Sequence, residues 1–278
     1  MQTFTASDGA KIAFEVAGRG RPLVLLHGLM AHSGFFAAQW SLAREFQLIG
    51  IDLRGHGGSR VSGDAPNVDR IASDVSDIVE QLGVEGAIGV GWSLGASVLW
   101  QVLAGRASPR FAGAVVVDMT PRVLNADDWQ LGLTPEVCDA RTTAIRHDYP
   151  NFAVLAGQNI FAQPLAGGTR ELAAWAGEQF KMNDAGAMSA VWGSLLDKDY
   201  RHLLPRIEQQ TLIVHGAKSQ LYGPATADYL AAALPRGRAV TFQHSGHAPH
   251  MEEPELFNSI LRDFAASLPR VRETQPTA

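Results

Sequence analysis

The chain has 278 residues, which is enough for one large α/β domain or two smaller ones with a substantial core. Its formal net charge of −5 gives no electrostatic reason to expect nucleic acid or an anionic membrane as a partner. No apolar run reaches the ~18 residues that span a bilayer, and residues 1–8 carry neither the basic nor the apolar region of a signal peptide. The single cysteine, Cys138, cannot form an intramolecular disulfide, which is compatible with the cytoplasmic location that we expect.

Short apolar runs alternate with helical patterns in the N-terminal part of the chain. Residues 11–17 alternate in polarity, whereas 23–26, 47–51 and 114–117 are continuous apolar runs, typical of strands buried on both faces of a parallel sheet. Residues 68–82 carry apolar side chains at helical spacing. This alternation predicts an α/β protein with a mostly parallel, doubly wound sheet.

Residues 122–205 differ in character, because strand-like runs give way to Ala, Trp and polar residues in helical patterns. The strand pattern resumes at 211–214 and again at 239–242. We therefore expect a core domain of residues 1–121 and 206–278, interrupted by a helical insertion.

The motif with the most chemical content is Gly-Trp-Ser-Leu-Gly at 91–95, between the apolar run 86–90 and a helical pattern. A serine between glycines where a strand runs into a helix is typical of a nucleophile elbow. The turn would hold Ser93 in strained backbone geometry and leave the N–H of Leu94 free to bind an oxyanion. The simpler alternative is a Gly/Ser turn without chemistry. A dinucleotide site is disfavoured, since the glycines miss the G-x-G-x-x-G spacing by one residue.

The loop at 27–30, His-Gly-Leu-Met, follows an early strand. Its backbone can turn the N–H of Leu29 toward the predicted nucleophile. Leu29 and Leu94 would then form a two-donor oxyanion hole, in which each donor contributes about 3–4 kcal/mol in well-studied hydrolases. An ordinary strand-end turn is the alternative.

A second loop, Ser-Gly-His-Ala-Pro at 245–249, directly follows the final predicted strand. From there His247 can reach over the sheet to Ser93 as a general base. His244 and His250 are neighbouring alternatives, but the glycine before His247 and its position at the strand end favour His247.

In their order along the chain, these motifs resemble the α/β-hydrolase superfamily. The His-Gly loop at 27–29, the Asp-Leu-Arg-Gly-His-Gly turn at 52–57, the elbow at 91–95, the helical insertion and the Gly-His loop at 246–247 follow the family's sequence, and the resemblance covers almost the whole chain. It implies the α/β-hydrolase fold, with residues 122–205 as a helical lid. We interpret the 52–57 turn as structural.

Within the superfamily the chain resembles small bacterial carboxylesterases and, more closely, the pimeloyl-acyl-carrier-protein methyl ester esterases of biotin synthesis. This closer resemblance rests on the elbow at 91–95, on His-Ala-Pro at 247–249, and on Asp-Asp-Trp at 127–129 followed by Gly-Leu-Thr-Pro at 132–135.

The acid of the catalytic triad is where the chain departs from its family. It is usually an aspartate after the strand before the final one, in a pattern like Gly-x-x-Asp-x-x-x-Pro, but Ser219 stands there within residues 216–224. Some members carry the acid after the strand that follows the nucleophile helix, where this chain has Asp118 behind the apolar run 114–117. A buried carboxylate needs a partner, and His247 would supply one, so we predict Asp118 as the acid. The alternative is that Asp118 caps the following turn.

We expect most of the large apolar side chains of the insertion to form the lid core and a minority to line an acyl pocket. They are Trp129, Phe152, Phe161, Leu165, Trp175, Phe180, Met182, Met188 and Trp192. Leu29 and Trp92, beside the predicted nucleophile, are the candidate substrate-binding residues. Four basic residues of the insertion suit an acidic carrier protein, although a mixed, solvated surface is the simpler interpretation. They are Arg141, Arg146, Arg170 and Lys181.

We therefore predict a serine carboxylic ester hydrolase, a carboxylesterase for short- to medium-chain esters, with no cofactor and no metal, since no His, Cys, Asp or Glu cluster has ligand spacing. Ser93 would attack the ester carbonyl, His247 would take its proton and Asp118 would orient the imidazole, giving an acyl-serine that water hydrolyses. The expected partner is a small-molecule ester, with an acyl carrier protein as an alternative, and neither nucleic acid nor a membrane.

Three other functions stay open. The first is a pimeloyl-acyl-carrier-protein methyl ester esterase. The second is a non-catalytic protein of this fold that binds a small ligand. The third is another reaction on the same triad, namely carbon–carbon bond hydrolysis, lactone opening or perhydrolysis.

Overall fold

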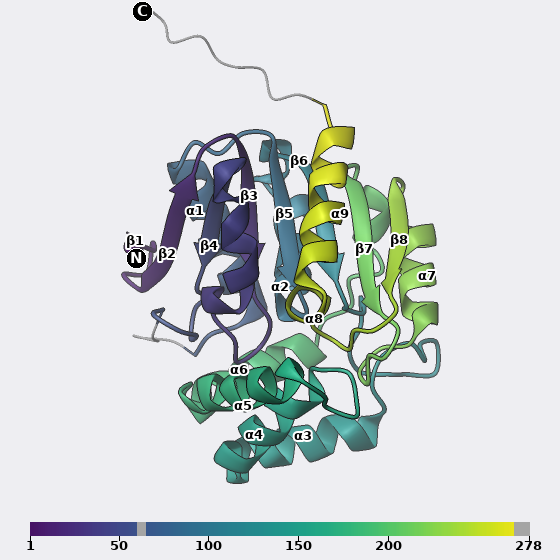
Figure 1. The fold of residues 1–278 in the computed structure, drawn as a ribbon. Coiled ribbons are helices and arrows are strands. Elements are labelled where there is room, and N and C mark those ends of the chain that lie inside the picture. Colours follow the sequence, from purple (N-terminus) through teal and green to yellow (C-terminus); the bar gives the residue numbers. More distant parts are fainter. Residues whose placement is uncertain (60–64, 270–278) are drawn as a thin grey trace, which may run out of the picture.

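An eight-stranded sheet with helices on both faces forms the centre of the described residues, 1–59 and 65–269 in the computed structural model (Figure 1). The strands are β1 (Gln2–Thr5), β2 (Lys11–Gly18), β3 (Arg21–Leu26), β4 (Phe46–Ile51), β5 (Ala87–Trp92), β6 (Phe111–Val117), β7 (Gln210–Gly216) and β8 (Gly237–Phe242). Their order is β1-β2-β4-β3-β5-β6-β7-β8. β2 is antiparallel to both of its neighbours, and all other pairs are parallel.

The helices divide between the two faces of the sheet and an insertion. The α-helices are α1 (Val68–Gln81), α2 (Leu94–Ala104), α3 (Pro135–His147), α4 (Tyr149–Asn159), α5 (Gly168–Lys181), α6 (Ala185–Leu196), α7 (Pro224–Ala233), α8 (Pro249–Glu252) and α9 (Pro254–Ser267). Three 3₁₀ segments are η1 (Ser33–Arg44), η2 (Ser108–Arg110) and η3 (Leu204–Arg206). α2 packs on β5 and on α1, while η1 and α9 pack together on the opposite face (Figure 1). No described helix is both long and apolar enough to cross a bilayer.

The central strands β3, β5 and β6 are almost entirely apolar because helices cover both of their faces. Every residue of β5 is buried, and so are the last five residues of β3 and of β6. α1 instead follows an amphipathic pattern, with Ile71, Val75 and Ile78 buried. It begins at Asn67, whose side chain accepts a 2.9 Å hydrogen bond from the N–H of Arg70.

Helices α3–α6 are inserted between β6 and β7 and lie beyond the carboxyl ends of the parallel strands (Figure 1). These helices fall within the segment 122–205 that we predicted as the insertion. Residues 270–278, which that prediction placed in the core domain, lie outside the described residues. The division into a core domain and a separate lid stays a prediction.

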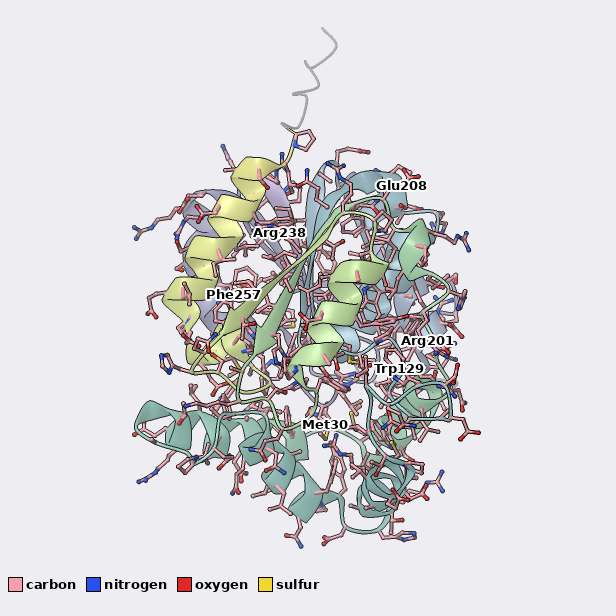
Figure 2. The ribbon with its side chains drawn as sticks, turned by 90° about the vertical axis from the view of Figure 1, so that its right-hand side faces the viewer. Met30, Trp129, Arg201, Glu208, Arg238 and Phe257 are labelled. Carbon is pink, nitrogen blue, oxygen red and sulfur yellow. The ribbon has the colours of Figure 1, made fainter. Side chains whose placement is uncertain are left out.

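The two ends of the insertion are tied together at its base. The N–H of Tyr200 donates a 2.8 Å hydrogen bond to the carbonyl of Pro121. Figure 2 shows Arg201 beside Trp129, and its guanidinium carbon is 5.2 Å from the centre of the Trp129 ring. Arg201 also forms a 2.9 Å ion pair with Asp128. These contacts fix the point from which the insertion extends over the end of the sheet.

Candidate active site

Ser93 lies in the sharp turn between β5 and α2, in a backbone conformation that non-glycine residues rarely adopt. Its φ is 52° and its ψ is −119°. The turn is held on both sides, because the Ser93 N–H donates to the Val117 carbonyl at 3.0 Å and the Ser93 carbonyl accepts from the Ala96 N–H at 2.8 Å. The strained turn presents the Ser93 side chain to a cavity under the insertion.

Two glycines flank this turn because there is no room for side chains. A Cβ on Gly91 would come 2.5 Å from the Gly95 carbonyl oxygen, and one on Gly95 would come 2.0 Å from the Leu26 carbonyl oxygen. The close packing of β5, α2 and β3 thus requires glycine at both positions.

Replacing Gly95 by Ala is expected to destabilise the fold by more than about 3 kcal/mol, because the clash is with backbone of a central strand. Thermal unfolding monitored by circular dichroism measures this loss. Gly193→Ala is the matched control, since Gly193 lies inside α6 with nothing within 4 Å of an added methyl group, and there alanine should stabilise by roughly 0.5–1 kcal/mol. Equal Tm values for the two variants would contradict this account of the turn.

Asp118 follows β6 directly and is buried, and both of its carboxylate oxygens accept hydrogen bonds. Oδ2 accepts from His247 Nδ1 at 2.6 Å and from Ser219 Oγ at 2.6 Å. Oδ1 accepts from His215 Nδ1 at 2.9 Å and from the Gly216 N–H at 3.4 Å. The structure therefore brings Asp118 and His247 together, and Ser219, at the usual acid position, donates to the same carboxylate.

The charge of Asp118 is set by two opposing effects. Burial by itself raises the pKa of this carboxyl, but hydrogen bonds from His215, His247 and Ser219 outweigh burial and hold the pKa below its ordinary value. Asp118 is therefore an ionised acceptor at neutral pH. The bond from His215 was not predicted from the sequence.

His247 is 2 % exposed and is positioned from both sides. Its Nδ1 is bonded to Asp118, and its backbone carbonyl accepts a 2.8 Å hydrogen bond from the indole N–H of Trp92. His247 and Ser93 both line the cavity, although no direct hydrogen bond joins their side chains in the described part of the chain. Such catalytic contacts often tighten only when substrate binds.

The two neighbouring histidines have other environments. His250 is fully buried against the rings of Phe36, Trp92 and Phe257. Burial lowers its pKa to about 3, so the ring is neutral. His244 is exposed, and its N–H donates to a Glu253 carboxylate oxygen at 3.2 Å. Neither histidine contacts Asp118 among the described residues.

The loop after β3 lies against the elbow and is braced by a buried histidine. A Cβ on Gly28 would come 3.3 Å from the Ser93 Cβ. His27 Nε2 accepts from the Leu53 N–H at 2.9 Å, so Nδ1 carries the proton and donates to the Gly28 carbonyl at 2.8 Å. Burial lowers the pKa of His27 to about 3, which agrees with this neutral ring.

The predicted oxyanion donors have unused N–H groups. Within the described residues, no carbonyl or side chain accepts a hydrogen bond from the N–H of Leu29 or of Leu94. Leu94 is the first residue of α2, where an N–H has no partner inside the helix. Both N–H groups are therefore available to a developing negative charge.

The turn at 52–57 is held by hydrogen bonds and an ion pair beside the loop of His27, and none of its residues lines the cavity. Asp52 accepts from the N–H groups of Ser33 and Gly58, each at 2.8 Å. Arg54 forms a buried two-point ion pair with Asp74, at 2.7 and 2.8 Å. These bonds fix the segment beside His27.

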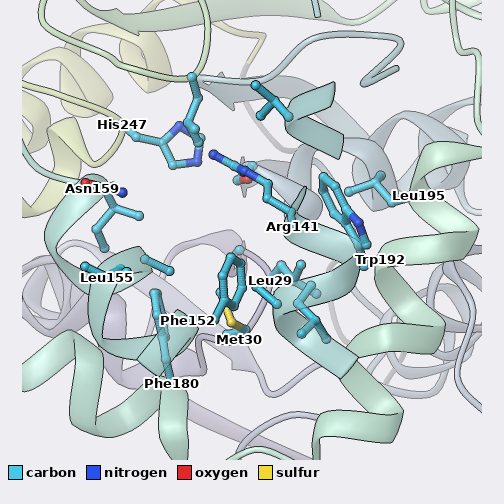
Figure 3. A pocket seen from close by; sticks show the side chains of 18 of the residues that line it. Leu29, Met30, Arg141, Phe152, Leu155, Asn159, Phe180, Trp192, Leu195 and His247 are labelled. Carbon is cyan, nitrogen blue, oxygen red and sulfur yellow. The ribbon is translucent and has the colours of Figure 1, made fainter. Parts of the chain in front are cut away.

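A cavity of about 370 Å³ lies between the elbow and the insertion (Figure 3). Leu29 and Trp92, the candidate substrate-binding residues, both line it. Of the apolar residues named in the insertion, Phe152, Phe180 and Trp192 line the cavity. Trp175 and Met182 are instead exposed at the surface. In the described part of the chain, no three His, Cys, Asp or Glu residues are grouped as a metal site would need.

A strained serine after a buried parallel strand, in one cavity with a histidine bonded to a buried aspartate, defines a hydrolase of the α/β class. The sequence matches the model of the family described as "Alpha/beta hydrolase family" over residues 23–260. Since this match spans most of the chain, the protein belongs to the alpha/beta hydrolase family, and the fold class predicted from the motif order is confirmed.

The chain is also similar to individual proteins of this family. The chain is 31% identical over 260 residues to a pimeloyl-[acyl-carrier protein] methyl ester esterase of Nitrosomonas europaea, covering 91% of this chain and 98% of that protein. A protein of the same name from Xanthomonas oryzae pv. oryzae is 30% identical, covering 92% and 99%. A solved esterase from Exiguobacterium antarcticum has a TM-score of 0.89 at 26% identity, covering 95% and 99%. These names agree with the predicted esterase class.

Proposed function

We propose that this protein is a serine carboxylic ester hydrolase with Ser93, His247 and Asp118 as its catalytic triad. The observation that carries the proposal is the 2.6 Å hydrogen bond between His247 Nδ1 and Oδ2 of the ionised, buried Asp118. His247 lines the same cavity as Ser93, whose backbone is strained. Because Nδ1 of His247 is bonded to Asp118, Nε2 is the nitrogen left to take the Ser93 proton.

The reaction then proceeds in two halves. Ser93 Oγ bonds to the ester carbonyl carbon as its proton passes to His247, and the N–H groups of Leu29 and Leu94 stabilise the oxyanion. Collapse of this intermediate breaks the ester C–O bond, and the alcohol leaves with the proton from His247. Water then attacks the acyl-serine as its proton passes to His247. The bond between the acyl carbon and Ser93 Oγ breaks, Oγ takes the proton back from His247, and the acid is released.

Helices α3–α6 serve as the lid in this proposal. They supply most of the apolar cavity wall, which excludes water from the acyl-serine and receives the acyl chain. We also propose a cytoplasmic location, supported by the absence of any cysteine pair in the sequence.

A panel of p-nitrophenyl esters of rising acyl length tests the proposal. For the wild-type protein, kcat/KM is expected to rise until the chain fills the cavity of about 370 Å³ and then to fall. Absence of turnover on every ester would contradict the esterase and favour the ligand-binding alternative. Turnover confined to lactones, carbon–carbon bonds or peroxide-dependent reactions would favour another chemistry on the same triad.

The second candidate is a pimeloyl-acyl-carrier-protein methyl ester esterase, favoured by the 31% identical relative that carries this name. Complementation of a biotin-requiring strain that lacks this esterase would support it. Failure to complement, together with good turnover of free esters, would leave a general carboxylesterase.

A further inference from the structure

One permanently charged side chain, that of Arg141, stands in the mostly apolar wall of the cavity. Arg141 lies on α3, and Figure 3 shows it pointing across the cavity toward His247. Among the described lining residues no Asp or Glu occurs, and the walls around Arg141 are formed by side chains such as Val137, Ile145 and Phe152. We predicted Arg141 from the sequence as part of a solvated surface, and its place in the cavity corrects that interpretation.

Arg141 also lacks a carboxylate partner, unlike many other arginines of the protein. Among the described residues, no carboxylate lies within 4 Å of its guanidinium, and no side-chain hydrogen bond uses it. Arginines that do pair with carboxylates are Arg54, Arg70, Arg106, Arg110, Arg122, Arg201 and Arg262. Burial lowers the pKa of Arg141 below its ordinary value, yet a guanidinium stays charged at neutral pH.

Two polar rings, those of Tyr222 and His247, line the same cavity as Arg141. Tyr222 faces the same space, and its ring lies 6.0 Å from the ring of His247. Burial raises the pKa of the Tyr222 phenol, and the positive charge of Arg141 offsets part of that rise. A guanidinium that faces mostly apolar side chains without a carboxylate partner costs free energy, which a bound anion would offset.

Building on the proposed esterase, we propose that Arg141 binds a carboxylate of the substrate, so that this site prefers esters carrying a second, free carboxylate group. The planar guanidinium matches a carboxylate with two parallel hydrogen bonds. One guanidinium neutralises one carboxylate, whereas a doubly charged phosphate would leave a net negative charge among apolar walls. The carboxylate can belong to the acyl part or to the alcohol part of the ester.

The experiment compares matched pairs of charged and neutral esters with the wild-type enzyme and three variants, of which Arg141→Lys is the conservative one. On the acyl side, monomethyl esters of linear dicarboxylic acids are set against methyl esters of monocarboxylic acids of equal length. On the alcohol side, carboxymethyl esters are set against ethyl esters of the same acid. The other two variants are Arg141→Met and the control Arg146→Met, which removes a charge from the same helix outside the cavity.

In the wild type, kcat/KM is expected to favour the charged member of one pair. Arg141→Met should lower kcat/KM for that charged ester by about 10- to 100-fold, the effect of losing a hydrogen-bonded charge partner, and leave the neutral ester within about threefold. Arg146→Met should preserve the preference. Arg141→Lys keeps the charge without the planar fork and should retain part of it. Which pair responds identifies the part of the ester that carries the carboxylate.

The outcomes separate this inference from the esterase proposal. Turnover of neutral esters with no preference in either pair, or an equal loss on charged and neutral esters in Arg141→Met, overturns the carboxylate site and leaves the esterase standing. Absence of turnover on all esters, with Ser93 unreactive toward a phosphonate, overturns the esterase itself.

Discussion

Replacing Ser93 by Ala should lower kcat for p-nitrophenyl ester hydrolysis by about 10⁶-fold, the size of loss seen for the nucleophile of a serine protease of another fold. Without the hydroxyl no acyl-serine can form, and only the oxyanion donors and substrate binding remain. The strained turn at φ 52° tolerates alanine no worse than serine, so Tm should change little. Steady-state kinetics and thermal unfolding on the same preparation measure both quantities.

A neighbouring serine provides the control for this experiment. Ser97 lies one turn further along α2, fully buried, and its Oγ has no hydrogen-bond partner among the described residues. Ser97→Ala should therefore keep most activity, and a phosphonate probe should label Ser93 alone. Labelling of Ser97, or activity of Ser93→Ala within tenfold of wild type, would exclude the mechanism. His247→Ala should cost about as much as Ser93→Ala, and the double variant little more, because the two groups act as one unit.

The fold was predictable because its signals are local. Continuous apolar runs identify the buried strands, and a strand-to-helix turn with tight glycine spacing identifies the elbow. The antiparallel edge strand β1, residues 2–5, was not predicted, since only Phe4 of its four residues is buried. Short edge strands bury too little apolar surface to leave a pattern in the sequence.

The parts of the site that were missed depend on contacts between distant segments. His215 reaches Asp118 because β6 and β7 are adjacent and parallel, with Val117 opposite Val214, and no local pattern reveals that register. The one sign of His215 in the sequence was a histidine near the end of an apolar strand. The indole bond from Trp92 to the His247 carbonyl likewise joins residues 155 positions apart.

The insertion was the least predictable region, because α4 and α6 contain no charged residue that would mark a solvent-facing side in the sequence. Phe180 and Trp175 lie in the same helix with similar chemistry, yet one lines the cavity and the other is exposed. Which face of each helix turns inward is decided by how the helices pack on one another. Arg141 was placed wrongly for the same reason.

The second substitution with a large expected loss of activity is at Asp118, the proposed acid of the triad, whose position departs from the usual one of the family. Asp118→Asn should lower kcat by about 10⁴-fold, as the loss of the corresponding carboxylate does in a serine protease of another fold. In the wild type all four hydrogen-bonding groups around the carboxylate are donors, from His215, Gly216, His247 and Ser219. An asparagine at this position has one oxygen, which can accept hydrogen bonds only from the donors on one side of the former carboxylate. Its NH₂ group suits the Ser219 side best, because that hydroxyl can turn to accept.

That orientation places an N–H donor against His247 Nδ1 and selects the wrong tautomer, with the proton on Nε2, where it cannot take the proton of Ser93. Steady-state kinetics measure the loss, and circular dichroism should show a folded protein. Ser219→Ala is the matched control. It removes one donor from Asp118 Oδ2 but leaves the bond to His247, so kcat should fall less than tenfold.

The two acid positions converge on one histidine, which allows a test by relocation. Ser219 Oγ lies 2.6 Å from Asp118 Oδ2, the same oxygen that His247 contacts. A carboxylate introduced by Ser219→Asp should therefore approach the histidine from the β7 side and restore part of the activity lost in Asp118→Asn. Ser219→Asp alone should be harmful, because a second carboxylate would then lie beside the buried Asp118, share one imidazole with it and repel it. Near-normal rates in Asp118→Asn would show that Asp118 only bonds His247 and does not control its tautomer, and the acid would have to lie elsewhere.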